Sequence, residues 1–378
     1  MKRICHLSSA HKGLDVRIFY KECVTLSKEG YDTNLVISAT LDDVEVASRY
    51  GVKVHPLPFK GRSRVKRMFF HTLNCYRLAR KIDADIYHIH DPELIPVACV
   101  LSALGKAVIY DVHEDLPLDV LSKGWIPRFL RGFIASASKS LEWLASKYFV
   151  DVVAATPAIL NRFKLYNHNA VNVNNYPLLS EFCGPGLTWA DKLSQVCYVG
   201  GIGESRGAMQ VVKAMEIAES GAVLKLAGNF SDPIIEAEVR KLSGWALVDY
   251  LGWLGRSEVS SVLQSSFAGL VTLHPLPNYI DSLPVKMFEY MGAGIPVIAS
   301  DFPLWKEIIE DNECGLCVNP LDPMSISKAI DFLYSNPADA ERMGLNGYNL
   351  ILSKYNWSVE GRKLVLFYRG IESRMRTA

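Results

Sequence analysis

Two acidic residues and a lysine stand close together in a segment where an apolar run leads into a helical pattern. The sequence DSLPVKMFEYMGAGIPVIAS places Asp281 eight residues before Glu289, with Lys286 between them. The spacing predicts a helix over about 284–292, starting at the carboxyl end of a strand, where open α/β sheets bind ligands. Free backbone amides, the positive end of the helix dipole and the charge of Lys286 predict a diphosphate site there.

The eight-residue separation limits where the two carboxylates can lie. Asp281 must lie on the loop before the helix, whereas Glu289 must lie on its second turn. Such a pair suits one extended ligand, with Asp281 toward a sugar and Glu289 toward ribose hydroxyls. The alternative is a buried glutamate on a Rossmann domain that binds no nucleotide.

A glycine-rich turn follows another apolar run, in the sequence CYVGGIGESRG at residues 197–207. A β-run, a glycine turn and a helix form the layout of a phosphate loop, although three glycines alone are not specific. Gly200, Gly201 and Arg206 are the candidate phosphate contacts in this turn. The alternative for Arg206 is an ordinary surface charge.

Histidines stand at the ends of two predicted strands. His113 follows the run VIYDV and lies next to acidic residues, which favours a functional role. His88 and His90 alternate along the run YHIHD, so they share one face of a strand, but the sequence offers no clear third metal ligand. We therefore interpret the pair as support for the core and the following loop.

Short β-rich runs alternate with amphipathic stretches such as residues 17–29 and 64–81, which predicts parallel sheets wrapped by helices. The alternation pauses between Asn174 and Lys192, where prolines and glycines indicate a linker, and we place a domain boundary near 176–190. The strands expected before the pause are Ile4–Ser8, Thr33–Ser38, Lys53–Leu57, Asp85–His90, Ala107–Asp111, Val152–Ala155 and Ala170–Val173.

The second half repeats the architecture without repeating the sequence. Its expected strands are Val196–Gly200, Val223–Ala227, Leu247–Leu251, Gly269–Leu273, Pro296–Ala299 and Gly315–Val318. Helical patterns close the chain at Pro323–Ser335, Ala338–Ser353 and Ser358–Arg374. The last pattern is long enough for a helix that returns to the first domain.

The composition agrees with two folded domains. A chain of 378 residues with 49% hydrophobic and 21% charged residues can bury two α/β cores. The net charge of +1 gives no support to nucleic-acid binding. Among eight cysteines only Cys314 and Cys317 form a CxxC pair, which we interpret as core thiols in a reducing cytosol. The polar start argues against a signal peptide, and no apolar run is long enough to span a membrane.

The segment from Asp281 to Ser300 resembles the signature of the retaining family-4 glycosyltransferases, a Glu-x7-Glu motif followed by a small-residue turn and a Pro-Val-Ile strand. The resemblance covers nearly the whole chain. It implies the GT-B fold, in which two Rossmann-like, doubly wound parallel-sheet domains of the α/β class face a central cleft. Residues 1–178 with a returning helix at about 356–378 would bind the acceptor, and residues 190–352 would bind the nucleotide sugar.

The resemblance also implies roles for individual residues. Arg206 matches the second member of a basic pair that grips the donor diphosphate, and His113 matches a histidine that faces the donor sugar. Gly13, in the loop from Ser8 to Gly13, matches a glycine that faces the diphosphate and acceptor. The catalytic candidates are His113 and Asp281. The donor-binding candidates are Gly13, Gly200, Gly201, Arg206, Asn229, Trp253, Leu254, Ser282, Leu283, Val285, Lys286 and Glu289.

Three positions depart from the family pattern. Asp281 replaces the first glutamate and reaches less far. Gly201 stands where the first member of the basic pair, usually arginine, is expected. Pro284 stands where glycine is frequent and removes one amide that could bind phosphate. Lys286 is our candidate to compensate for that lost amide.

The runs HDPELIP and YDVHED resemble the branch of the family that builds bacterial surface polysaccharides. That resemblance implies O-antigen, capsule or exopolysaccharide synthesis on a lipid-linked or oligosaccharide acceptor, in the cytoplasm or peripherally on the inner face of the cytoplasmic membrane. The expected donor is a nucleotide-diphosphate hexose or N-acetylhexosamine, with UDP the first expectation, and no metal or other cofactor is required.

Two basic and aromatic stretches, residues 59–82 and 123–133, favour contact with anionic lipid headgroups or a lipid diphosphate. Amphipathic helices with solvated basic faces are the alternative for these stretches. For the whole chain the alternatives are another GT-B enzyme, such as a nucleotide-sugar 2-epimerase or an inverting transferase, and a non-catalytic GT-B scaffold.

Overall fold

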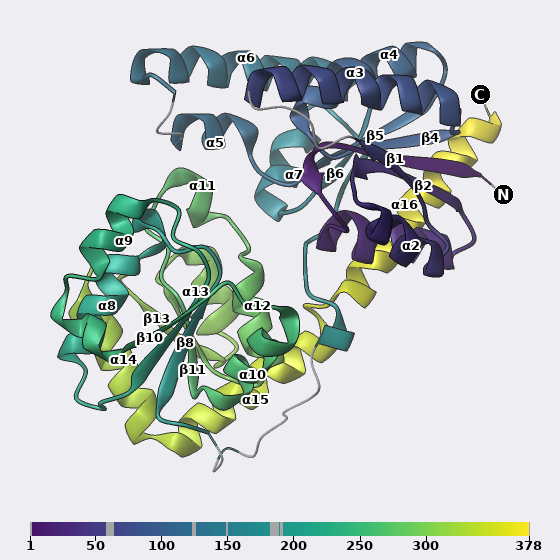
Figure 1. Cartoon of the computed structure of the whole chain (residues 1–378). Coiled ribbons are helices and arrows are strands. Elements are labelled where there is room, and N and C mark those ends of the chain that lie inside the picture. The colour runs from purple at the N-terminus through teal and green to yellow at the C-terminus, as the bar shows by residue number, and fades with distance from the viewer. Residues whose placement is uncertain are drawn as a thin grey trace. The chain divides into compact units, whose positions relative to one another are not determined.

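The computed structural model describes residues 2–57, 64–122, 126–148, 150–181, 189 and 192–377. The chain divides into two compact units, and each is built on its own parallel sheet (Figure 1). Unit 1 comprises Met1–Asn175 and Ser358–Ala378, and unit 2 comprises Tyr176–Trp357. The predicted pair of Rossmann-like domains is confirmed.

Unit 1 contains a seven-stranded parallel sheet in the order β3-β2-β1-β4-β5-β6-β7. The chain order reverses between β1 and β4, and the carboxyl ends of such a strand pair are where these sheets bind ligands. The strands are β1 (Arg3–Lys12), β2 (Asp32–Ser38), β3 (Lys53–Leu57), β4 (Ile86–Ile89), β5 (Ala107–Val112), β6 (Asp151–Ala154) and β7 (Ala170–Asn172). The helical segments are η1 (Val16–Cys23), α1 (Val24–Lys28), α2 (Leu41–Arg49), α3 (Arg64–Ile82), η2 (Pro92–Leu94), α4 (Ile95–Ala103), α5 (Leu116–Ser122), α6 (Arg128–Tyr148), α7 (Pro157–Lys164) and α16 (Trp357–Thr377).

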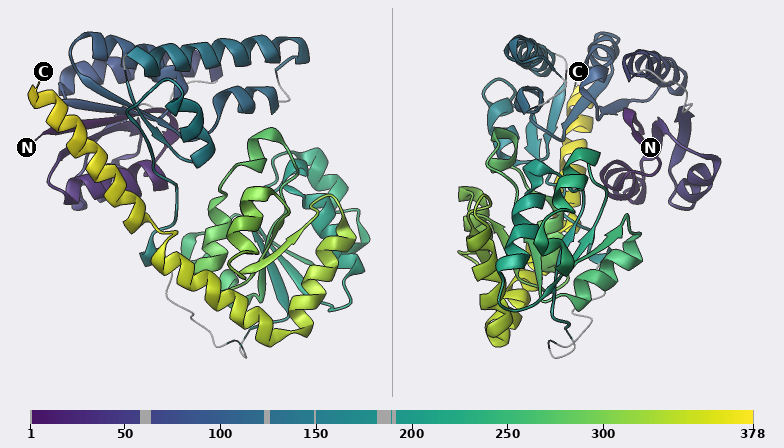
Figure 2. Two further views of the ribbon diagram at one scale, coloured as in Figure 1. Left: turned by 180° about the vertical axis from the view of Figure 1, so that it is seen from behind. Right: turned by 60° about the vertical axis from the view of Figure 1, so that its left-hand side comes forward.

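Side chains alternate along each strand of unit 1 between two buried faces. Helices α3, α4, α6 and α7 cover the face that holds Leu7 and Ile89. Segments η1, α1, α2 and α16 lie on the opposite face, which two views agree on (Figures 1 and 2). His6, His88 and Asp111 alternate with the apolar residues, so they lie on this second face, where η1 and α16 contact them.

Unit 2 contains a six-stranded parallel sheet in the order β10-β9-β8-β11-β12-β13. Its order reverses between β8 and β11. The strands are β8 (Gln195–Val199), β9 (Val223–Ala227), β10 (Val248–Gly252), β11 (Ala268–Val271), β12 (Val297–Ser300) and β13 (Gly315–Val318). The helical segments are η3 (Leu179–Glu181), η5 (Glu204–Arg206), α8 (Ala208–Ile217), α9 (Pro233–Val239), η6 (Ser243–Leu247), α10 (Arg256–Ser265), α11 (Pro277–Ile280), α12 (Val285–Gly292), α13 (Pro303–Ile309), α14 (Pro323–Ser335) and α15 (Pro337–Ser353). Helices α8 and α14 pack on one face, and α10, α12 and α13 pack on the other.

The start of unit 1 differs from the prediction. The predicted strand Ile4–Ser8 and the loop from Ser8 to Gly13 are corrected, because β1 continues to Lys12, which pairs with Ser38 after a register shift beyond Leu7. Extra pairing to β2 therefore orders residues that the sequence pattern assigns to a loop.

The predicted helix over residues 17–29 is also corrected. Its first part is a π-helix, η1, and α1 completes it. The Asp15 carboxylate begins η1 by accepting hydrogen bonds from the amides of Arg17 and Ile18. The wider turn changes which side chains of this segment face the sheet, and π-helical turns are frequent at functional sites.

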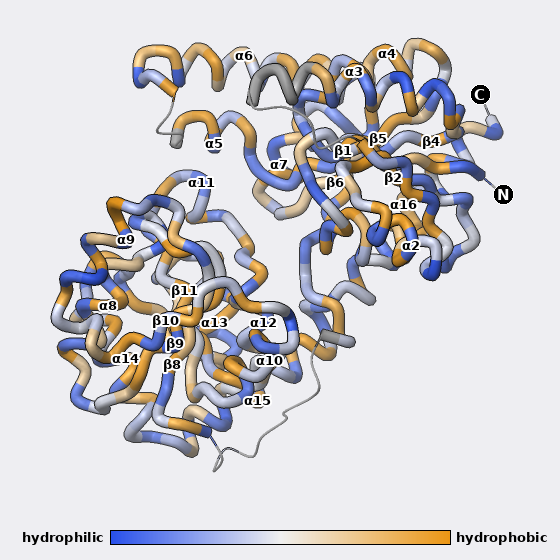
Figure 3. Tube along the Cα trace, viewed as in Figure 1, coloured by the Kyte–Doolittle hydropathy of each residue, from blue (hydrophilic) through white to orange (hydrophobic). Residues whose placement is uncertain are grey.

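The C-terminal helix α16 returns to unit 1, as predicted. Leu364, Tyr368 and Ile371 are buried there, and Arg374 pairs with Asp151. Apolar residues gather in the strands of both sheets, whereas α6 alternates between apolar and polar residues along its length (Figure 3). Among the described helices, none combines the length and the apolarity that a membrane crossing needs.

Candidate active site

The loops that follow β8 and β11 meet where the strand order of unit 2 reverses. The amide of His274 donates to the carbonyl of Ser205 at 2.9 Å, which ties the loop after β11 to η5. Gly207 has a φ of +78°, and a Cβ at this position would lie 2.2 Å from the carbonyl oxygen of Thr272. Only glycine allows this close approach, so Gly207 lets the two loops pack against each other.

Lys286 lies in the first turn of α12 and is buried beneath these loops. Its Nζ lies 3.6 Å from the centroid of the Tyr198 ring. Among the described residues no hydrogen-bond partner of Nζ is present. Burial, and then the charge of Arg206, lower the pKa of Lys286 to about 7. A buried ammonium without an acceptor is costly, which indicates a position that an anion completes.

Arg206 approaches Lys286 from η5. Its exposed side chain lies across Gly201, since a Cβ on that glycine would lie 3.6 Å from the guanidinium carbon. The Tyr198 hydroxyl lies 3.1 Å from the carbonyls of both Gly201 and Arg206 and so supports the turn from below. Two cations thus face the same turn, with the ring of Tyr198 between the loop and the core.

The segment before α12 is held by a tryptophan. Trp305 of α13 donates from Nε1 to the carbonyl of Ser282 at 2.7 Å, and the Ser282 hydroxyl donates to the carbonyl of Tyr279 at 2.8 Å. Asp281 ends α11 and is exposed. Glu289 is half-buried on the second turn of α12, and its charge partly opposes the lowering of the Lys286 pKa.

The ends of β9 and β10 lie beside the phosphate-loop turn. The amide of Gly200 donates to the carbonyl of Ala227 at 2.9 Å, and the amide of Gly228 donates to the carbonyl of Gly252 at 2.6 Å. Asn229 and Trp253 follow directly and are exposed. Leu254 is half-buried, as are Leu283 and Val285 at the start of α12. These hydrogen bonds link the loops after β9 and β10 to the glycine turn that leads to Arg206.

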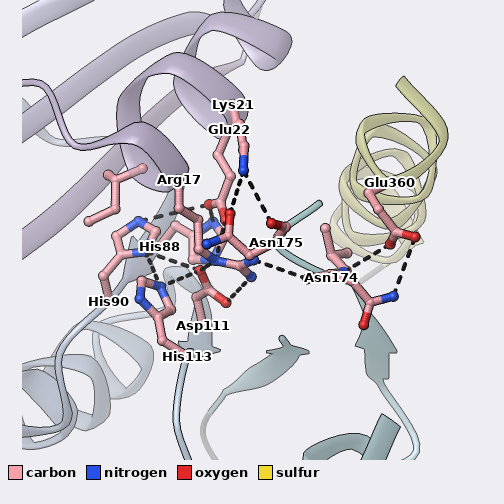
Figure 4. A network of polar contacts seen from close by, with 12 residues as sticks. Arg17, Lys21, Glu22, His88, His90, Asp111, His113, Asn174, Asn175 and Glu360 are labelled. Carbon is pink, nitrogen blue, oxygen red and sulfur yellow. Dashed lines mark hydrogen bonds and ion pairs between the residues drawn. The ribbon is translucent and has the colours of Figure 1, made fainter. Parts of the chain in front are cut away.

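In unit 1 a buried charged cluster lies behind His113. Arg17 holds Asp111 with two hydrogen bonds, from Nε to Oδ2 at 2.9 Å and from Nη2 to Oδ1 at 2.7 Å (Figure 4). Nε2 of His113 lies 2.7 Å from Oδ2 of Asp111, and Nδ1 of His90 lies 3.2 Å from the same oxygen. These side chains lie next to the switch point of the sheet between β1 and β4.

The prediction that His88 and His90 lack a third potential metal ligand is wrong. Strand β1 brings His6 beside them, and η1 brings Glu22, with ligand atoms within 4.8 Å of one another. All four side chains are buried. Hydrogen bonds already engage part of this set: Nδ1 of His6 lies 2.9 Å from Nε2 of His90, and Nδ1 of His88 lies 2.8 Å from the hydroxyl of Tyr368. Nε2 of His88 and both carboxyl oxygens of Glu22 have no hydrogen-bond partner among the described residues.

Comparison with known proteins identifies the family. Residues 16–173 match the family described as Glycosyltransferase Family 4, and residues 185–350 match the family described as Glycosyl transferases group 1. A phosphatidyl-myo-inositol mannosyltransferase from Mycobacterium leprae (strain TN) is 23% identical over 333 residues, which cover 84% of this chain and 82% of the relative. This chain belongs to the family-4 glycosyltransferases of GT-B fold.

Solved structures share the fold of this glycosyltransferase over nearly its whole length. Sucrose-phosphate synthase from Thermosynechococcus elongatus has a TM-score of 0.75 at 16% identity and covers 99% of this chain and 100% of that chain. HepE from Anabaena, solved in complex with UDP and glucose, has a TM-score of 0.74 at 11% identity and covers 98% of this chain and 100% of that chain.

The candidate residues of the glycosyltransferase fall into two groups. The cations Lys286 and Arg206 meet at the glycine turn of unit 2, and Glu289 lies one turn further along α12. The other donor candidates lie on the loops after β8, β9 and β10 and around the start of α12: Gly200, Gly201, Asn229, Trp253, Leu254, Ser282, Leu283 and Val285. His113 and Gly13 lie in unit 1. Gly13, with a φ of +61°, donates from its amide to the carbonyl of Ser38, so it ends β1 beside β2.

The sequence pattern did not predict the residues behind His113, namely Arg17, Asp111, Glu22 and Tyr368. The sequence did contain a signal for them. The amphipathic segment carries charged residues on the side that faces the sheet, and the strand histidines stand at alternate positions, so they share one face of their strand. Of the basic and aromatic stretches, Lys60, Arg62, Lys123 and Trp125 lie outside the described residues. Cys314 and Cys317 are free thiols, and burial raises the pKa of each to about 12.

Proposed function

We propose that this glycosyltransferase moves a hexose or N-acetylhexosamine from a nucleotide-diphosphate donor, first of all a UDP-sugar, to a lipid-linked or oligosaccharide acceptor. The proposal includes retention of the anomeric configuration and independence of metal ions. One observation carries it: the buried Nζ of Lys286, which lacks a hydrogen-bond partner among the described residues, shares the turn after β8 with Arg206. HepE, solved with UDP and glucose, supports the choice of UDP.

The proposed chemistry is stabilisation of the leaving diphosphate. Breaking the bond between sugar and diphosphate develops positive charge at the anomeric carbon and negative charge on the departing group. Each charge-assisted hydrogen bond from Lys286 or Arg206 contributes ~1.5–3 kcal/mol. The amino end of α12 adds ~0.3–2 kcal/mol, although Pro284 supplies no amide. Two cations and one helix end offset the developing charge by electrostatics alone, which supports a metal-independent step.

The remaining candidate residues have positioning roles in this proposal. Glu289 binds the ribose hydroxyls, and Asp281 with His113 binds and orients hydroxyls of the donor sugar. Backbone groups next to Gly200, Asn229 and Leu254 line the base, with the apolar residues around them. The acceptor hydroxyl attacks on the face that the diphosphate leaves, which gives retention.

We further propose a place in bacterial surface-polysaccharide assembly at the inner face of the cytoplasmic membrane. The runs HDPELIP and YDVHED support this branch by resemblance. The mannosyltransferase relative, whose name specifies a phosphatidyl-inositol acceptor, supports a lipid-borne acceptor. Exposed apolar and basic side chains along α6, among them Phe129, Phe133 and Lys147, support contact with anionic lipid.

The experiment screens UDP-, GDP- and dTDP-sugars for thermal stabilisation of the purified protein and then assays transfer with the donor that binds. Lys286→Ala and Glu289→Ala are expected to abolish transfer while the far-ultraviolet spectrum stays unchanged. Turnover at the wild-type level in both variants would refute the site. Activity that survives EDTA is expected, and loss that Mg²⁺ restores would contradict metal independence.

Two alternatives have distinct outcomes in the same experiment. Conversion of the nucleotide sugar without any acceptor would indicate a 2-epimerase, and inverted product would indicate an inverting transferase. If no nucleotide diphosphate binds, a non-catalytic scaffold is favoured. Gly201 supports this alternative, because it stands where the family usually has an arginine.

A further inference from the structure

We infer that a directed chain of hydrogen bonds ending at Asp111 fixes the tautomer of His113, so that its Nδ1 is presented to substrate as a hydrogen-bond acceptor. The inference rests on the proposed function, in which His113 contacts the donor sugar. Asp111, Arg17 and His90 act in it as positioning residues (Figure 4).

The buried cluster contains two carboxyl groups, Asp111 and Glu22, and one guanidinium, Arg17. Burial disfavours ionisation of Asp111, but Arg17, and then His113, hold the pKa of its carboxyl well below the usual value. Burial, and then the charge of Asp111, raise the pKa of Glu22 well above the usual value. The geometry agrees, because Arg17 donates to both oxygens of Asp111, whereas neither oxygen of Glu22 accepts a hydrogen bond in the described part of the chain. The negative charge therefore resides on Asp111, and the protonated form of Glu22 is favoured. An ionised carboxylate can only accept hydrogen bonds.

The direction of every neighbouring hydrogen bond follows from that single charge. Nε2 of His113 and Nδ1 of His90 must both donate to Oδ2 of Asp111, at 2.7 and 3.2 Å. Nε2 of His113 and Nδ1 of His90 lie 3.3 Å apart, which fits two N–H groups that donate to the same oxygen. Burial lowers the pKa of His90 to about 4, so its ring is neutral and carries one proton.

The chain of hydrogen bonds continues from His90 to His6, Tyr368 and His88, with each donor and acceptor set by the one before. Since the proton of His90 lies on Nδ1, its Nε2 must accept from Nδ1 of His6, at 2.9 Å. Burial also lowers the pKa of His6 well below its usual value, so Nε2 of His6 accepts from the Tyr368 hydroxyl, at 3.4 Å. The oxygen of Tyr368 in turn accepts from Nδ1 of His88, at 2.8 Å.

The chain leaves His113 only one arrangement in its neutral form. Its proton lies on Nε2 and its lone pair lies on Nδ1. The His113 side chain is 20% exposed, whereas Asp111 and His90 are fully buried. Within the described part of the chain, no hydrogen bond reaches Nδ1 of His113. A sugar hydroxyl, which can donate, is the group that completes this nitrogen, and a group that only accepts is disfavoured.

A divalent cation is the competing occupant of the same cluster. Two sets of side chains could hold it: His6, Glu22, His88 and His90, or His90, Asp111 and His113. Binding to the first set would break the hydrogen bond between His6 and His90, and binding to the second would displace the proton from Nε2 of His113. Arg17 already donates to both oxygens of Asp111, and hydrogen bonds already join His6 to His90 and His113 to Asp111. The hydrogen-bonded chain is therefore favoured, and metal content becomes an outcome of the test.

The first arm of the experiment is nitrogen-15 NMR of the histidine side chains in the intact protein, with His113→Ala to assign the resonance. We expect the Nε2-protonated tautomer at His113 and the Nδ1-protonated tautomer at His90 and His6. A proton on Nδ1 of His113, or one bound divalent ion per purified chain, would overturn the inference. This arm needs no substrate and is read on the wild-type protein, so it stays decisive if Asp111→Asn fails to fold.

The second arm compares Asp111→Asn with the control Asp115→Asn. The control makes the same change from carboxylate to carboxamide nearby in the sequence, but at a residue outside the chain of hydrogen bonds. An asparagine can donate to Nε2 of His113 and so drive the proton onto Nδ1. We expect the tautomer signal of His113 to invert and kcat to fall about 100-fold, with UDP affinity unchanged. Asp115→Asn is expected to leave the tautomer in place.

The two proposals fail differently. If the wild-type protein binds no UDP or other nucleotide diphosphate, the proposed function fails, whatever the histidine spectrum shows. If UDP binding and transfer are intact but Asp111→Asn transfers at the wild-type rate, the positioning role fails and the proposed function stands.

Discussion

Lys286 shows how one residue acquires its chemistry from its surroundings. An exposed lysine is charged throughout the physiological range, but burial and Arg206 bring the pKa of this one to about 7. The fold buries the Lys286 side chain without a hydrogen-bond acceptor among the described residues, which is unfavourable for its charged form. A bound diphosphate would supply that acceptor and raise the pKa again.

This shift predicts that nucleotide binding is coupled to proton uptake. Above pH 7 the free protein has lost the Lys286 proton, whereas the complex keeps it, so binding must take up a proton. UDP itself is fully ionised there, because its last pKa is about 6. We expect affinity for UDP to fall roughly tenfold between pH 7.5 and 8.5. Calorimetry at pH 8 in two buffers of different ionisation enthalpy measures the uptake.

The matched control is Lys286→Met, which keeps the length of the side chain and cannot titrate. Its weaker binding of UDP is expected to be independent of pH between 7.5 and 8.5. Equal affinities of the wild-type protein at both pH values would contradict the link between Lys286 and the diphosphate.

At the scale of elements, close packing positions the short helix α12. A Cβ on Gly269 of β11 would lie 2.3 Å from the ring of Tyr290, so only glycine lets α12 pack this close to the strand. The Tyr290 hydroxyl then accepts from the amide of Val199 at 2.9 Å, which links α12 to the end of β8. The helix that carries Lys286 and Glu289 is therefore fixed against the strand that leads to Arg206.

Helix α6 predicts a membrane contact at the same scale. Phe129 is 83% exposed and Phe133 is 74% exposed, and lysines and arginines flank them. Burial of two phenylalanine side chains in a lipid interface contributes free energy to membrane binding. We therefore expect the double variant Phe129→Ser, Phe133→Ser to bind vesicles at least about tenfold more weakly. Sedimentation with vesicles that contain phosphatidylserine measures the binding.

The control for α6 is Leu165→Ser, which removes an apolar side chain that is also 83% exposed, just after α7. That change is expected to leave vesicle binding as it is. Equal weakening in both proteins, or no sedimentation of the wild type, would remove α6 from the proposed membrane surface.

At the scale of the whole molecule, the chain passes between the units twice, after Asn175 and after Trp357. Unit 1 ties together the residues next to these two crossings. The amide of Asn174 donates to Oε2 of Glu360 at 2.9 Å, and Nζ of Lys21 donates to Oδ1 of Asn175 at 2.6 Å. Glu360 is nearly fully buried, and it joins α16 to the segment that follows β7, next to the crossing.

Loss of this tie is expected to destabilise unit 1. Glu360→Ala leaves the buried amide of Asn174 without its acceptor, which should lower the free energy of unfolding by about 1–3 kcal/mol. Urea unfolding measures the loss, and UDP binding reports separately on unit 2. Arg369→Ala is the control, because Arg369 lies on the same helix and its exposed ion pair with Glu29 is worth about 0–1 kcal/mol. Equal losses in the two variants would contradict the role of Glu360.

The sequence by itself determined the alternation of strands and helices, the returning C-terminal helix and the family signature from Asp281 to Ser300. These features depend on periodicity and on neighbours within a few residues, which a single chain displays directly. It did not predict the extension of β1 to Lys12 or the π-helical turn η1, because the first depends on pairing with β2 and the second on how η1 packs against the sheet.

Only the tertiary structure decided what the polar residues can do. Arg17 and Asp111 are 94 residues apart in the chain, and Tyr368 reaches His6 across 362 residues. Burial and charge partners set the protonation of these groups, and both arise only when distant segments pack together. The motif located the diphosphate candidates in the sequence, whereas packing around Tyr198 and Tyr290 left Lys286 buried without a hydrogen-bond acceptor among the residues described.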